Sequence, residues 1–156
     1  MNEPLVLIPG LMADARLFLP QMVALGAARQ MQVCLPARGE TVEQMSEAMV
    51  PGLPERFSLL GHGLGGDVAL DLVRRVPDRV TRGILVASEP PGEPAPPPAA
   101  REGGGGGARA GRLAQAMREE IPEGALADTP WRNDVLALVA DMALGLGEGV
   151  FLRQSK

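Results

Sequence analysis

The sequence predicts an α/β fold in which a mainly parallel β-sheet lies between two layers of helices. The first observation is a series of short, continuously apolar segments, beginning with Leu5–Ile8 and ending with Val80–Ala87. Strands that are apolar on both faces are typical of a parallel sheet covered on both sides. The second observation is that these segments alternate with stretches of helical periodicity, as in a doubly wound, three-layer fold. The 156 residues are enough for one such domain with its own core.

The individual elements follow from apolar runs and from the residues that end them. The expected strands are Leu5–Ile8, Met31–Leu35, Phe57–Leu60 and Val80–Ala87. Between them we expect a helix that ends at Gly26, a helix opened by the capping box of Thr41 and Gln44, and a helix from Gly66 to Val76.

The composition changes after Glu89, which divides the chain into three parts. We expect an α/β core over residues 1–89, a Pro/Gly-rich linker over 90–110 and a helical segment over 111–156. The linker contains five consecutive glycines, Gly103–Gly107. In the last part we expect helices over 111–120 and 131–146, the second preceded by Thr129 as its N-cap. The residues expected on the buried face of that helix are Val135, Leu136, Val139, Met142, Ala143 and Leu146.

Charge and cysteine content exclude several classes of function. The net charge of −4 argues against binding to nucleic acid or to an anionic membrane. Cys34 is the single cysteine, so an intrachain disulfide and a cysteine zinc cluster are excluded, and we expect no metal and no cofactor. The N-terminal apolar run stops at Pro9 and is too short for a signal peptide or a membrane span. We therefore expect a cytoplasmic protein.

The segment Phe57–Gly66 carries most of the functional information. It reads as a strand, a glycine-rich turn and the start of a helix, which is the pattern of the nucleophile elbow G-x-S-x-G. Gly63 stands where that pattern has its serine, while the elbow glycines Gly61, Gly65 and Gly66 permit the close approach of backbone that the turn needs. Because glycine has neither a hydroxyl nor a thiol, no covalent acyl intermediate can form at this position.

With this elbow, the segments Leu7–Leu11, Arg38–Thr41 and Pro77–Val80 make the chain resemble the α/β-hydrolase family of cap-containing serine esterases and lipases. The resemblance covers Leu5–Ala87, and Glu89–Lys156 is similar to the family's helical cap. It implies a truncated α/β-hydrolase fold, because the family's acid and its catalytic histidine follow later strands that this chain does not reach. It also implies descent from an ester or acyl hydrolase that is inactive or impaired as written.

The resemblance assigns further roles at the elbow. The amides of Leu11 and Leu64 would form an oxyanion hole, which favours an anion or a carbonyl oxygen and so a small carboxylate or ester ligand. His62 is the only histidine of the chain. It is either a packing residue or a general base that acts on a water in the place of the missing serine side chain. Glu89 follows the fourth strand and is either a catalytic acid or a loop residue before the proline run.

Two other classes of function remain open. Gly61, Gly63 and Gly66 also match the dinucleotide fingerprint G-x-G-x-x-G, with Glu89 as the ribose-binding acid. Against this, two strands precede the motif and the spacing to Glu89 exceeds the usual interval of about 20 residues. The third class is a non-catalytic scaffold that forms homo-oligomers through an exposed edge strand at Val80–Ala87 or through the helices of the last segment.

Overall fold

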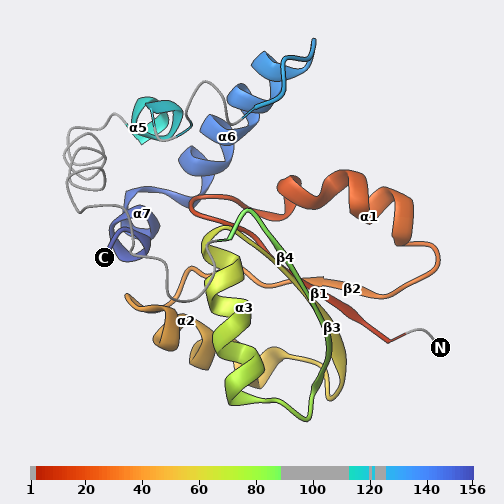
Figure 1. Ribbon diagram of the computed structural model, residues 1–156. Coiled ribbons are helices and arrows are strands. Elements are labelled where there is room, and N and C mark those ends of the chain that lie inside the picture. The colour runs from red at the N-terminus through yellow and green to blue at the C-terminus, as the bar shows by residue number, and fades with distance from the viewer. Residues whose placement is uncertain (1–2, 89–112, 120, 122–125) are drawn as a thin grey trace.

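The computed structural model describes residues 3–88, 113–119, 121 and 126–156 (Figure 1). The expected linker 90–110 and Glu89 lie outside the described residues. In chain order the elements are β1 (Leu5–Ile8), η1 (Ala15–Phe18), α1 (Leu19–Leu25), β2 (Met31–Val33), α2 (Val42–Met49), η2 (Val50–Gly52), β3 (Phe57–His62), α3 (Leu64–Arg75), β4 (Val80–Val86), α5 (Leu113–Glu119), α6 (Arg132–Leu146) and α7 (Glu148–Gln154).

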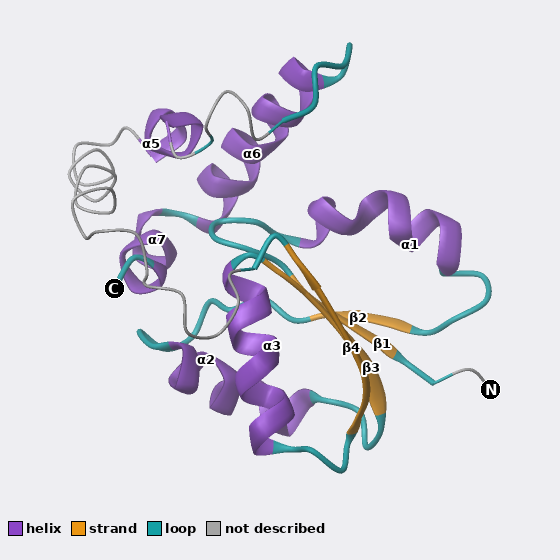
Figure 2. Ribbon diagram, in the orientation of Figure 1, coloured by secondary structure: helices purple, strands orange, loops and turns teal. Residues whose placement is uncertain are grey.

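Within the described residues, four parallel strands form one sheet in the order β2-β1-β3-β4. The chain first moves outward from β1 to β2, then returns to the other side of β1 and continues through β3 to β4. Helix α1 lies on one face of the sheet, and α2 and α3 lie on the other (Figure 2). The doubly wound α/β architecture expected from the sequence is therefore confirmed.

Both faces of the inner strands are buried, as continuous apolar runs predict. Val6 and Ile8 of β1 pack with α2 and α3 in the main core, whereas Leu5 and Leu7 pack with Phe18 on the opposite face. Strand β4 is different because no strand among the described residues covers its outer edge. Its last residues, Ile84, Leu85 and Val86, are 51%, 46% and 43% exposed.

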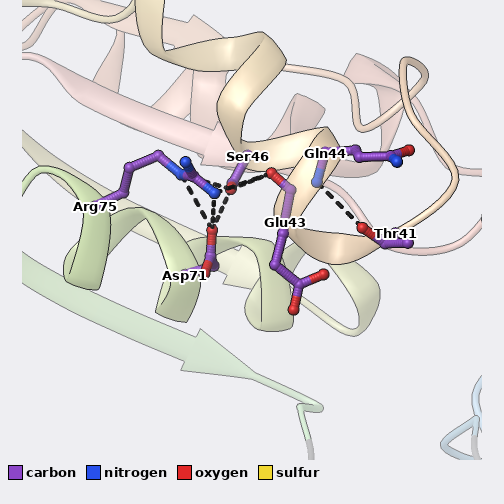
Figure 3. Close-up of polar contacts among 6 residues, drawn as sticks. All are labelled: Thr41, Glu43, Gln44, Ser46, Asp71 and Arg75. Atoms are coloured by element: carbon purple, nitrogen blue, oxygen red, sulfur yellow. Dashed lines mark hydrogen bonds and ion pairs between the residues drawn. The ribbon is translucent and has the colours of Figure 1, made fainter.

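A buried polar contact joins α2 to α3 on their shared face of the sheet (Figure 3). Ser46 is fully buried, and its Oγ lies in hydrogen-bonding range of the Asp71 carboxylate and of the Glu43 carbonyl. Arg75 completes the group with an ion pair to Asp71 at 3.2 Å and a bond from Nη2 to the Glu43 carbonyl. Each polar group of this contact has a partner, as burial requires.

The start of α2 matches the sequence in part. The Thr41 hydroxyl accepts from the Gln44 amide at 3.3 Å, which is the expected N-cap. The Gln44 side chain, however, accepts from the amide of Glu40 rather than from that of Thr41. The second half of the capping box is therefore displaced by one residue.

Helices α5, α6 and α7 form a second apolar cluster with Met12, which follows β1. The expected start of α6 is wrong: the helix begins at Arg132, and Thr129 contributes only its carbonyl, which accepts from the Arg132 amide. Met142 and Ala143 are buried as expected, but Val135 is 38% exposed. The buried residues of α6, Ala140, Met142 and Ala143, all lie in its second half.

None of the described helices is by itself long and apolar enough to cross a membrane. Helices α6 and α7 reach that length and composition only when they are taken together, and they are bent by 98° at the break between them.

Candidate functional site

The candidate site lies where the strand order reverses, between β1 and β3 at their carboxyl ends. Ligands of open α/β sheets bind at such switch points, because the connections on either side diverge there. Two segments meet at this point, the loop after β1 and the turn between β3 and α3. A Cβ atom at position 63 would lie only 3.7 Å from Gly10 Cα, so the two segments are in contact.

Gly63 has the backbone conformation of a strained turn. Its φ of 52° and ψ of −125° lie in a region that residues with side chains rarely adopt. The turn is held by two hydrogen bonds, from the Gly63 amide to the Val86 carbonyl at 2.9 Å and from the Gly66 amide to the Gly63 carbonyl at 2.7 Å.

Position 63 nevertheless has room for a side chain. Apart from its two neighbours in sequence, the nearest atoms of the described residues to a Cβ there would be Gly10 Cα at 3.7 Å and the Ala87 carbonyl oxygen at 3.9 Å, both ordinary contacts. The turn therefore keeps the conformation and the space of a nucleophile position, although its residue has no nucleophile.

The flanking glycines, unlike Gly63, have no space for a side chain. A Cβ at Gly61 would collide with the Gly65 carbonyl oxygen, and one at Gly65 would collide with the Ile8 carbonyl oxygen. A Cβ at Gly66 would collide with the hydroxyl of Ser88. At Gly61 and Gly65 the colliding atoms belong to the backbone, so α3 can approach the ends of β1 and β3 this closely only because these two residues are glycine.

The predicted oxyanion-hole donors lie on the two segments that meet at Gly63. Leu64 is the first residue of α3, where amides have no acceptor within the helix. Leu11 directly follows Gly10 in a turn closed by a bond from the Ala13 amide to the Gly10 carbonyl at 3.2 Å. Their joint role as donors to one oxygen stays a prediction.

His62 is half-buried at the end of β3. A Cβ on Gly10 would lie 2.9 Å from its Nδ1, so the ring packs against the loop after β1. The buried Nδ1 has no hydrogen-bond partner among the described residues. Burial lowers the pKa of the imidazole, which keeps the ring neutral near neutral pH. A catalytic base is normally oriented by an acid, and no described carboxylate bonds to this ring.

Ser88 lies beside the elbow at the end of β4. Its hydroxyl is 3.3 Å from the carbonyl oxygens of Gly63 and Val86 and donates to one or the other. Ala87, just before it, has a φ of 51°, an uncommon value for a residue with a side chain. Glu89 lies outside the described residues, so its proposed role as an acid stays a prediction.

Sequence analysis missed two residues next to the site, Met12 and Gln154. The Met12 amide donates to Gln154 Oε1 at 2.9 Å. The two residues are 142 positions apart. No local pattern links them, and only the packing of α7 against the loop after β1 brings them together.

The described groups limit what this arrangement can do chemically. The first-turn amides of α3 and its dipole favour a negative charge or a carbonyl oxygen near Gly63. Among the described residues, no group of three His, Cys, Asp or Glu side chains could hold a metal ion. Gly63 supplies no nucleophile, so no covalent acyl intermediate can form at this position.

The parallel sheet, the switch point and the positive-φ turn into a helix define the class: the chain has an α/β-hydrolase fold. The thermophilic esterase from Thermogutta terrifontis superposes with a TM-score of 0.72 at 20% identity, over 99% of this chain and 62% of the esterase. The enol-lactonase from Burkholderia xenovorans LB400 gives a TM-score of 0.76 at 18% identity, over 99% of this chain and 64% of the lactonase. The chain thus spans less than two thirds of each of these structures.

Sequence comparison gives a more particular likeness. The chain is 49% identical over 55 residues to the pimeloyl-[acyl-carrier protein] methyl ester esterase of Aromatoleum aromaticum, a match over 35% of this chain and 22% of the esterase. It is 41% identical over 66 residues to the same-named esterase of Nitrosomonas europaea, over 38% of this chain and 26% of that protein. No family model matches the sequence. The solved structures thus show an α/β-hydrolase fold, which the resemblance of the motifs also implies, and the sequence matches cover about a quarter of each esterase.

Proposed function

We propose that this chain is a non-hydrolytic relative of ester hydrolases and that its elbow binds a small carboxylate or ester. The observation that carries the proposal is the contrast among the elbow glycines. At Gly61, Gly65 and Gly66 a side chain would collide with neighbouring atoms, whereas position 63 has ordinary van der Waals space around a Cβ. The space that a nucleophile would occupy is therefore present without the nucleophile.

The chemistry of the site and the names of its relatives favour the same class of ligand. A helix N-terminus and backbone amides favour a carboxylate or an ester carbonyl oxygen. The two curated relatives are methyl ester esterases. Short acyl chains ending in a carboxylate or a methyl ester are thus the ligands that we propose. With a few backbone amides as the expected donors, we expect a dissociation constant of about 1 mM.

Calorimetric titration with butyrate and with methyl butyrate tests this proposal. We expect saturable binding by the unmodified chain and its loss in Gly63→Leu, because the larger side chain fills the space beside Gly10. Gly63→Ala is the matched control, because it brings the same backbone strain but adds only a methyl group, for which the described residues leave ordinary space. Circular dichroism would show that both variants are folded. The absence of binding heat at millimolar ligand, or equal binding by both variants, contradicts the proposal.

A second property is favoured by one feature, the outer edge of β4, which no described strand covers. We propose that two copies of the chain associate by antiparallel pairing of their β4 strands. The strand has seven residues, VTRGILV, with Arg82 as its only charge and no proline. Charged residues and prolines protect edge strands from pairing with other chains. A long apolar edge strand with few of them pairs readily.

A groove beside this edge supports the same pairing. It has a volume of about 320 Å³ and lies between α3 and β4, with Ala69, Val73 and Leu85 among its lining residues. Gly83 also lines it, and a Cβ there would meet no atom of the described residues within 4 Å. Antiparallel pairing centred on Gly83 brings Leu85 of each copy next to the groove of the other, which makes the surface self-complementary.

Sedimentation equilibrium at tens of micromolar tests the association. We expect a dimer for the unmodified chain and a monomer for Ile84→Lys, which places a charge on the edge strand. Val23→Lys is the control, because Val23 lies on α1 and is already 76% exposed. A monomeric unmodified chain refutes the proposal. A dimer that Leu144→Lys disrupts and Ile84→Lys does not would move the interface to α6.

A further inference from the structure

We infer that Gln154 is a positioning residue for the candidate site: its side-chain amide fixes the loop after β1 and thereby sets the Leu11 amide beside Gly63. The inference rests on the proposed function, because Leu11 is one of the two donors predicted to bind the ligand. It concerns the last turn of α7, a segment with no counterpart in the elbow pattern.

The first step of the argument is the conformation of Met12. Its φ is +50°, in the left-handed region that is disfavoured for residues with a side chain. Such a conformation persists only where its surroundings enforce it. Met12 is fully buried, and it packs with Phe151 of α7 and Met117 of α5 in the second apolar cluster.

The second step is the hydrogen bond that fixes the backbone at this residue. The Met12 amide donates to Gln154 Oε1 at 2.9 Å, and the contact is partly buried. This bond holds the orientation of the Leu11–Met12 peptide and so the ψ angle of Leu11. The backbone of Leu11 is in this way held from its carboxyl side by a side chain of the last helix.

The third step is that Gln154 is itself held from the other side. Its Nε2 donates to the carbonyl of Pro36 at 2.8 Å, and Pro36 is fully buried after β2. A primary amide has an acceptor and a donor at opposite corners, so one glutamine can join the two loops. Glutamate would keep the acceptor for Met12 and lose the donor for Pro36.

Neighbouring contacts dock α7 on the same edge of the sheet without touching Met12. Arg153 Nε donates to the Ala37 carbonyl at 3.1 Å, and Lys156 pairs with Glu40 at 2.7 Å. Gly147, with a φ of 83°, permits the sharp turn that brings α7 back from α6 (Figure 1). These contacts supply a matched control, because they anchor the same segment to the loop after β2 alone, whereas Gln154 also holds the loop after β1.

The test compares Gln154→Met, Gln154→Glu and Arg153→Met by amide hydrogen exchange and by the NMR shifts of the Leu11 and Leu64 amides. We expect Gln154→Met to speed exchange of the Met12 amide by about tenfold and to shift the Leu11 resonance, because it removes one partly buried hydrogen bond. Gln154→Glu keeps the acceptor and is expected to retain most of the protection. Arg153→Met is expected to leave Met12 unchanged.

The inference is overturned if Gln154→Met leaves the Met12 exchange rate and the Leu11 shift unchanged, or if Arg153→Met changes both equally. The second result would mean that α7 matters only through general docking. Titration of the same samples with butyrate separates this inference from the proposed function. Failure of the unmodified chain to bind butyrate refutes the proposed ligand, whereas the exchange data still decide whether Gln154 positions the loop. If butyrate binds, we expect a severalfold loss of affinity in Gln154→Met alone.

Discussion

The sheet half of the chain, residues 3–88, and the helical segment, residues 113–156, are stabilised in different ways. In the sheet half, strands and helices bury continuous apolar faces, and the close approach of α3 depends on glycines that admit no side chain. In the helical segment, α5 and α7 bury apolar residues in the second cluster, but the buried residues of α6 all lie in its second half. The link of this segment to the sheet consists of the Met12 cluster and a few side-chain contacts from α7. Packing thus fixes the first region, and a few long-range contacts orient the second.

The largest difference in unfolding free energy is expected when one glycine in each region is replaced by alanine. Gly65→Ala is expected to lower the free energy of unfolding by about 4 kcal/mol or more, because the new methyl group collides with backbone oxygens of Ile8 and Pro9. Gly145→Ala on α6 is expected to be neutral or to stabilise by up to about 1 kcal/mol, since its Cβ has ordinary space. Urea unfolding measures both. Similar losses in the two variants would remove the distinction.

A pair of leucines gives the next largest effect. Leu72 of α3 is fully buried in the main core, and Leu144 of α6 is 60% exposed. Leu72→Ala is expected to cost about 2–5 kcal/mol of unfolding free energy. Leu144→Ala is expected to change it by less than about 0.5 kcal/mol. A large cost at Leu144 in urea unfolding would show that α6 is packed more extensively than the structure indicates.

The sequence predicts the elements of the sheet half better than those of the helical segment. The strands, the end of α1 at Gly26 and the Thr41 cap could be predicted because apolar runs, glycine and capping residues act locally. The elbow pattern could be recognised in the sequence because it, too, is formed by neighbouring residues. The start of α6 was predicted wrongly, because Thr129 and Pro130 fit a helix start but the backbone turns helical only at Arg132. The bond between Met12 and Gln154 could not be predicted, because it depends on how the last helix packs.

A smaller effect is expected for the buried hydroxyl that joins α2 to α3. Ser46→Ala removes the contact of Ser46 with Asp71 and is expected to cost about 1–2 kcal/mol. Ser155→Ala, at the end of α7, removes only a local bond to the Phe151 carbonyl and is expected to cost less. Thermal unfolding followed by circular dichroism would compare them. A greater loss at Ser155 would contradict the view that the sheet half carries most of the stability.

The smallest effect is a pH dependence that arises from His62 in the sheet half. Burial lowers the pKa of His62 in the folded chain, so the unfolded chain binds the proton first as the pH falls. Stability is therefore expected to decrease below about pH 6.5, the ordinary pKa of histidine, and His62→Gln is expected to remove that decrease. Glu3 and Asp14 have lowered pKa values, so their contributions are lost only at more acidic pH. An unchanged pH profile in His62→Gln, measured by urea midpoints at several pH values, would refute this assignment.

The central claim is that the elbow is intact in shape and lacks a nucleophile. Hydrolysis of p-nitrophenyl butyrate by the unmodified chain, His62→Ala and Gly63→Ser, with mass spectrometry for a covalent adduct, tests it most directly. We predict no turnover above buffer and no adduct for the unmodified chain. For Gly63→Ser we predict no more than weak turnover, because His62, the single histidine of the chain, is packed against Gly10 and has no acid partner among the described residues. Turnover by the unmodified chain that disappears in His62→Ala, or turnover by Gly63→Ser at ordinary enzyme rates, would contradict the account.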